Sequence, residues 1–136
     1  KYAFGLISLC NRIMLLMFAL TITLNIIIMK KNELIAEFMG VGKHYEAQSS
    51  NPFNQYHESW NSLMTVVESI ESDERYDVEI LQYGTRIIER TKTDCIEVVN
   101  NIADISFDSK IDHTYDAIVK FIKYCEKKSL IDSLDS

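Results

Sequence analysis

Residues 76–100, which read YDVEILQYGTRIIERTKTDCIEVVN, carry the pattern that decides the fold. Val78 and Ile80 alternate with charged neighbours, and this two-residue period is typical of a β-strand. The remainder predicts a turn at residues 83–85, a strand at 86–91, a turn at 92–94 and a strand at 95–100. Because the connections are only a few residues long, we expect an antiparallel meander of three strands, or of four if residues 105–107 also pair.

Two amphipathic helices precede the predicted sheet. In residues 56–72, apolar side chains recur at helical spacing on one face, at Trp60, Leu63, Met64, Val67 and Ile70. Trp60 is expected to anchor the core. A shorter helix is predicted at residues 32–40, because Asn32 can cap its start and Gly40 can end it.

A last helix is predicted after the sheet. Ser109 and Asp112 resemble a capping box at its start. Its inner face is expected to carry Ala117, Ile118, Phe121, Ile122 and Cys125. The two main helices, at residues 56–72 and after Ser109, should therefore pack on the antiparallel three- to four-stranded sheet. This gives an α+β domain with an apolar helix at its N-terminus. We divide the chain into an apolar segment (1–29), a single α+β domain (30–130) and a frayed tail (131–136).

The apolar segment contains 17 consecutive residues without charge, residues 13–29, which read IMLLMFALTITLNIIIM. A membrane-spanning helix needs about 20 apolar residues, so this run is at the short limit. A signal peptide fits poorly, because no cleavage site of small residues follows the run. Three interpretations stay open: a membrane anchor, a helix buried in the domain, and a non-native extension ahead of a natural start at Met29.

The charge of the chain is unevenly distributed. Its formal net charge is −6, yet residues 1–29 contain Lys1 and Arg12 and no acid, which leaves −8 for the remainder. Such an acidic domain repels nucleic-acid phosphates and anionic membrane surfaces. The three cysteines are odd in number and far apart, which predicts free thiols and neither a disulfide framework nor a zinc site.

Three stretches resemble a known group of proteins: residues 32–40 (NELIAEFMG), 56–70 (YHESWNSLMTVVESI) followed by 76–78, and 109–124 (SKIDHTYDAIVKFIKY). Together they resemble small uncharacterised proteins found in Bacteroidetes genomes and their phages. The order of Trp-bearing helix, sheet and last helix is also similar to the phage α-β-α sandwich domain family. The resemblance implies a phage or mobile-element origin and a chain that opens just before residue 32. It implies no activity and no functional residues.

The residues proposed for binding are Tyr45, Phe53, Tyr56 and His57. The aromatic ones cluster around a predicted loop at residues 41–54, and aromatic side chains concentrate in protein interfaces. The alternative is that they seal this loop onto the sheet. Tyr56 and His57 are expected to open the predicted helix. Histidine is the residue type most often used as a general base, but no partner for His57 is evident in the sequence.

Neither a metal nor another cofactor is expected, because His44, His57 and His113 lack the short spacing of metal ligands. We predict a small cytoplasmic accessory domain of phage or mobile-element origin. It would bind an unknown protein partner, without catalysis and without binding nucleic acid. One alternative is a domain anchored in a membrane through residues 13–29. A further alternative is an enzyme that uses His57 with nearby carboxylates.

Overall fold

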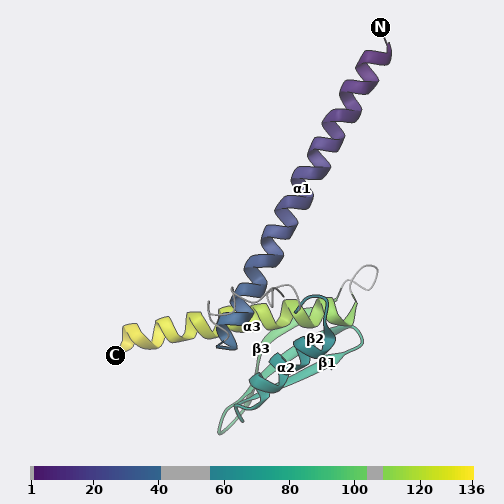
Figure 1. Ribbon diagram of the computed structural model, residues 1–136. Helices are drawn as coiled ribbons and strands as arrows, with labels where there is room; N and C mark the ends of the chain where they lie inside the picture. Colours follow the sequence, from purple (N-terminus) through teal and green to yellow (C-terminus); the bar gives the residue numbers. More distant parts are fainter. Residues whose placement is uncertain (1, 41–55, 104–108) are drawn as a thin grey trace. The chain divides into compact units, whose positions relative to one another are not determined.

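The computed structural model describes residues 2–40, 56–103 and 109–136. In chain order its elements are α1 (Tyr2–Phe38), α2 (Trp60–Glu71), β1 (Tyr76–Leu81), β2 (Gly84–Arg90), β3 (Cys95–Ile102) and α3 (Lys110–Asp135) (Figure 1). The chain forms two compact units, Lys1–Lys30 and Lys31–Ser136, and α1 contributes residues to both. The predicted α+β class, with an apolar helix at the N-terminus, is confirmed.

The sheet is an antiparallel meander in the order β1-β2-β3, as predicted. Its first turn differs in detail, because Gln82 and Tyr83 form the turn and Gly84, expected within it, is the first residue of β2. Glycine is needed there, since a Cβ atom would lie 2.5 Å from the carbonyl oxygen of Asn101 on β3. The fourth strand considered at residues 105–107 lies outside the described residues.

One face of the sheet is covered and the other is open to solvent. The covered face presents Tyr76 and Ile87, which join apolar residues of α2 and α3 in one core. On the open face, Arg86 forms ion pairs with Glu79 and Glu97 on the neighbouring strands. Each of these charged side chains keeps 40% or 41% of its surface exposed. Within the described residues, both helices therefore pack on the other side, and the domain has two layers.

α1 runs without a break over Tyr2–Phe38, so the prediction of a separate helix beginning at Asn32 is wrong. The apolar residues before Asn32 are themselves helical, and this overrides its local capping tendency. Asn32 is fully buried in the helix interior, next to the buried Ile35 and Ala36. Gly40 does follow the helix end, and its φ of 71° is a left-handed conformation that glycine adopts without strain.

α2 begins later than the predicted residue, Tyr56. The hydroxyl of Ser59 caps it by accepting a hydrogen bond from the backbone N–H of Ser62. Tyr56 and His57 therefore lie in the turn before α2 and do not open it. Trp60 is 38% exposed, so it is not the core anchor that its spacing suggested. The core positions of this helix are Leu63, Val66, Val67 and Ile70.

α3 begins with the predicted capping box. The backbone N–H of Asp112 donates to the hydroxyl of Ser109, and the backbone N–H of Ser109 donates to the Asp112 carboxylate. The predicted inner face is confirmed, with Ala117, Ile118, Phe121 and Ile122 buried and Cys125 half-buried. The helix continues to Asp135, so most of the predicted frayed tail at residues 131–136 is helical.

Candidate functional site

The apolar part of α1 presents its side chains to the outside on every face. All side chains of residues 4–27 are exposed, including large ones such as Phe4, Leu16 and Phe18. The helix over Phe4–Phe38 reaches a mean hydropathy of 2.2 over its most apolar 18 residues, and it is long and apolar enough to cross a membrane. None of that apolar stretch is buried, unlike the core helix of a soluble protein.

The structure describes two of the four residues that the sequence proposed for binding. Tyr45 and Phe53 lie outside the described residues, whereas Tyr56 and His57 are in the turn before α2. Tyr56 packs against the apolar core, and burial raises the pKa of its hydroxyl. This position fits a residue that seals the turn onto the domain.

His57 belongs to a chain of polar side chains. Its Nδ1 accepts a hydrogen bond from Asn32 Nδ2 at 3.2 Å, and its Nε2 lies 3.2 Å from Glu58 Oε1. The hydroxyl of Tyr115 donates to Asn32 Oδ1 at 2.8 Å. Burial raises the pKa of Tyr115, which keeps its hydroxyl protonated as a donor. Asn32 is fully buried, and these hydrogen bonds connect the end of α1, at Asn32, with α3 and with the turn before α2.

Asn32→Ala should destabilise the domain by about 1–3 kcal/mol, because it leaves buried polar atoms with one hydrogen bond fewer. Tyr115→Phe should cost about 1 kcal/mol. The double variant should lose less than the sum of the two, because both changes remove the same hydrogen bond. Urea unfolding of the full chain in detergent measures all three. Strict additivity of the two effects would contradict a direct bond between these side chains.

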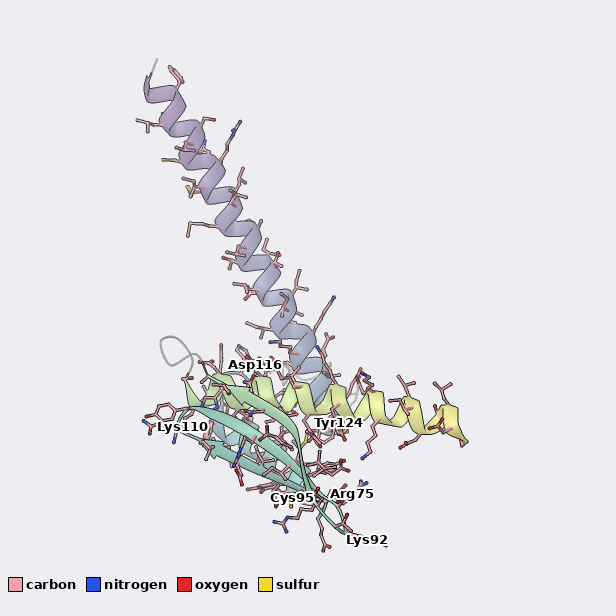
Figure 2. All side chains as sticks on the ribbon, turned by 180° about the vertical axis from the view of Figure 1, so that it is seen from behind. Arg75, Lys92, Cys95, Lys110, Asp116 and Tyr124 are labelled. Atoms are coloured by element: carbon pink, nitrogen blue, oxygen red, sulfur yellow. The ribbon has the colours of Figure 1, made fainter. Side chains whose placement is uncertain are left out.

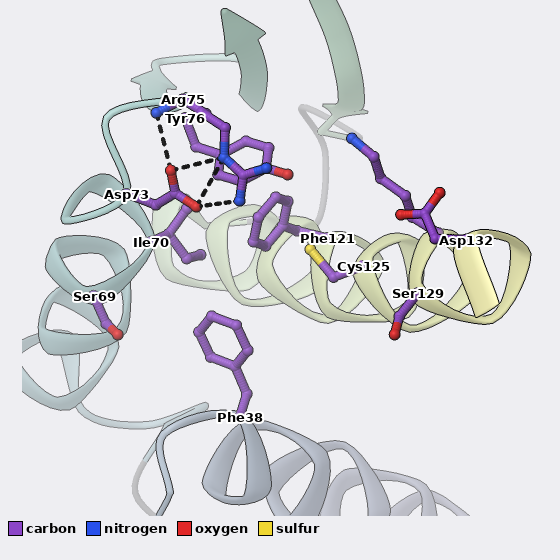
Figure 3. A pocket seen from close by; sticks show the side chains of 11 residues that line it. Phe38, Ser69, Ile70, Asp73, Arg75, Tyr76, Phe121, Cys125, Ser129 and Asp132 are labelled. Atoms are coloured by element: carbon purple, nitrogen blue, oxygen red, sulfur yellow. Dashed lines mark hydrogen bonds and ion pairs between the residues drawn. The ribbon is translucent and has the colours of Figure 1, made fainter. Parts of the chain in front are cut away.

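A pocket of about 320 Å³ opens within the domain, where the end of α1, α2, β1 and α3 meet (Figure 3). Its apolar lining consists of Phe38, Ile70, Tyr76 and Phe121. The centre of the Phe121 ring lies 4.9 Å from that of Tyr76 and 6.4 Å from that of Phe38, and both contacts are edge-on. The polar lining consists of Ser69, Asp73, Arg75, Cys125, Lys128, Ser129 and Asp132.

The cations beside the pocket are engaged by carboxylates. Arg75 donates to Asp73 from Nε at 3.0 Å and from Nη2 at 2.7 Å, and these hydrogen bonds hold the pKa of Asp73 below its ordinary value. Lys128 donates to Glu89 at 2.6 Å. Burial raises the pKa of the Cys125 thiol, so the nucleophilic thiolate is disfavoured. The pocket therefore suits binding better than covalent chemistry.

The ion pair between Arg75 and Asp73 lies near the end of the sheet that carries the β2–β3 turn. Arg75, Lys92 and Cys95 lie at this end (Figure 2). The backbone carbonyl of Arg75 accepts a hydrogen bond from the N–H of Arg90 at 2.6 Å, which ties the segment after α2 to β2. Hydrogen bonds therefore hold both the backbone and the guanidinium group of Arg75 beside the pocket.

Glu89 should make the stability of the domain sensitive to acid. Its carboxylate accepts hydrogen bonds from Lys128 and Tyr124, and the bond from Lys128 is the main cause that lowers its pKa below the ordinary 4.5. A lowered pKa in the folded state gives a contribution that is complete at higher pH and is lost as the pH falls through that pKa. Glu89→Gln should therefore flatten the loss of stability between about pH 5 and pH 3.

Urea unfolding at several pH values measures this slope. Glu126→Gln, on an exposed position of α3, is the matched control for the removal of one carboxylate. An equal slope in the Glu89→Gln variant and the parent would contradict the assigned role of this carboxylate.

Potential metal ligands are dispersed in the described part of the chain. No group of three His, Cys, Asp or Glu residues there is placed to hold a metal ion. His113 is buried, and its Nδ1 lies 2.8 Å from the hydroxyl of Thr85. Cys10 and Cys95 are exposed thiols, and His44 lies outside the described residues.

The pocket and the contact between Asn32 and Tyr115 have no counterpart among the features predicted from the sequence. Those two residues are 83 positions apart in the chain, and no local pattern links them. The spacing of Cys125, Lys128 and Asp132 does place them on one side of α3. This signal could have suggested a polar edge, but it did not reveal that Phe38 would face it.

Comparisons with protein-family models, with curated proteins and with solved structures find no match for this chain. The resemblance to small Bacteroidetes and phage proteins therefore stays a prediction.

Proposed function

We propose that the apolar part of α1 spans a membrane and anchors a small non-catalytic domain that binds another protein. The observation that carries the proposal is the exposure of every side chain in residues 4–27. Apolar surface left in water is unfavourable by about 25 cal/mol per Å², and a bilayer removes this penalty.

The charges at the ends of the apolar run support insertion. Arg12 precedes it and Lys30 and Lys31 follow it, so the 17 residues between are free of charge. At 1.5 Å per residue these residues span about 25 Å. The long side chains of Lys and Arg can extend this length, because they reach from the apolar region to the polar interface.

The pocket and the charge of the domain support the binding role. An apolar lining bordered by charged groups suits a partner segment in which an apolar side chain lies next to a polar one. The net charge of −8 outside residues 1–29 disfavours nucleic acid. Catalysis is disfavoured because His57 is engaged by Asn32 and because burial raises the pKa of Cys125.

Fractionation of cells that express the natural gene tests the anchor. The full chain, identified by intact mass, should sediment with membranes, resist alkaline carbonate and dissolve in detergent. A soluble product opening at Met29 would overturn the anchor. It would favour a second candidate, a soluble interaction domain, which is supported by the division of the chain after Lys30.

The binding role is tested by a photo-crosslinking residue in place of Ser129, beside the pocket. A specific protein adduct should form in membranes and should decrease when Phe38→Trp fills the pocket. Formation of the same adduct with a crosslinker at the exposed Lys110, which begins α3 and does not line the pocket, would contradict binding there.

A further inference from the structure

We infer that α1 pairs in the membrane with α1 of a second copy of this chain, through a stripe formed by Asn11, Met14, Phe18, Thr21 and Asn25. This inference rests on the membrane span proposed above. The stripe residues are alternately three and four positions apart, which keeps one face of a helix against a parallel partner. At 3.6 residues per turn, their directions fall within an arc of about 80°.

The polar side chains in the apolar run differ in whether they form hydrogen bonds within the helix. The hydroxyls of Thr21 and Thr23 each donate to the carbonyl four residues earlier, at 2.8 Å, so their protons are satisfied within the helix. Asn25 presents an exposed carboxamide, which forms no hydrogen bond to the described parts of the chain. In hydrocarbon an unsatisfied amide is unfavourable, which gives this side chain a reason to find a partner.

A second copy of the chain matches this carboxamide in chemistry and in depth. An amide side chain has two donor hydrogens and an acceptor oxygen, so two Asn side chains complement each other. Copies inserted with the same topology place Asn25 at the same depth. That depth is about 8 Å inside Lys30 along the helix, within the apolar region.

The rest of the stripe fits the same parallel arrangement. Phe18 lies seven residues before Asn25, and Asn11 lies seven before Phe18, so all three hold the same position of a heptad. Met14 and Phe18 supply apolar packing between the two carboxamides. Asn11 lies beside Arg12 at the other end of the run, where a second amide pair would fix the register of the helices.

Disulfide crosslinking in native membranes tests the pairing. In the full chain, Cys10, Cys95 and Cys125 are changed to Ser, and one cysteine is introduced at a time. Met14→Cys lies on the stripe, and Leu16→Cys lies on the opposite face of the same helix turn. On oxidation, the first should form dimers with at least about tenfold higher yield, because only stripe residues face each other across a parallel pair.

The role of Asn25 is tested without weakening insertion. Asn25→Leu makes the span more apolar, yet the association constant of the dimer should fall by roughly three- to tenfold, as for loss of one hydrogen bond between helices in a membrane. Combining Asn25→Leu with Ile27→Asn moves the carboxamide to the opposite face. Crosslinking should then shift from position 14 to position 16.

Each outcome separates the pairing from the anchor. A chain that inserts but crosslinks equally at both positions, or forms no dimer, would overturn the pairing and leave the anchor intact. Crosslinks from position 14 only to other proteins would replace the second copy with a different partner. A chain absent from the membrane fraction would overturn both proposals.

Discussion

Changing Leu16 and Leu20 together to Arg should release the chain from the membrane. Each Arg near the centre of a spanning helix is unfavourable by about 2.5–3.5 kcal/mol, and the two side chains replaced are exposed leucines that favour hydrocarbon. The combined effect corresponds to a shift of more than about a thousandfold in partition between membrane and water. Fractionation followed by alkaline extraction and quantitative blotting measures it.

The control places the same substitutions elsewhere in the chain. Leu130→Arg with Leu134→Arg changes two exposed positions near the end of α3 and should leave the chain in the membrane. If both double variants stayed in the membrane fraction to the same extent, α1 would not be the anchor. Both substituted positions of α1 lie off the stripe proposed for pairing, so the result concerns insertion alone.

Phe121→Ala should cost the domain about 3–5 kcal/mol of its free energy of unfolding. Phe121 is 2% exposed, and its ring contacts those of Tyr76, Phe38 and Tyr124. Truncation removes these contacts and leaves a cavity next to the existing pocket. Since small domains are stable by only about 5–15 kcal/mol, this one side chain carries a large share.

Urea unfolding of the full chain in detergent, followed by the fluorescence of Trp60, measures this loss. Leu130→Ala is the matched control on the same helix, because Leu130 is 66% exposed, and it should change the stability by less than about 0.5 kcal/mol. A loss below about 1 kcal/mol for Phe121→Ala would contradict a core centred on this ring.

Local sequence patterns predicted which helices and strands form more accurately than they predicted where each one begins and ends. The alternation around Val78 and the short connections after it were sufficient for an antiparallel meander, because strand period and turn length act over a few residues. The capping box at Ser109 was also correct, since both of its partners lie within one helical turn. The predicted helix start at Asn32 was wrong, because the residues before Asn32 are already helical and α1 continues through this position.

The candidate site was predicted only in part. Tyr56 packs against the core, whereas the contacts of His57 depend on Asn32 and, through it, on Tyr115, which belong to other helices. The helical spacing predicted that Trp60 lies in the core. The buried face of α2 instead includes Val66 and leaves Trp60 partly exposed. Periodicity defines an apolar face only to within about one residue to either side, and the packing of the sheet selects among these positions.

Local patterns were sufficient to predict the α+β class, the meander, the inner face of α3 and the apolar character of residues 13–29, because each depends on neighbours in the chain. The burial of Asn32, the hydrogen bond from Lys128 to Glu89 and the pocket shared by Phe38 and Phe121 depend on how distant segments pack together. These features arise where surfaces from distant segments meet. The free energy of such contacts depends on burial and distance, which no spacing along one segment encodes.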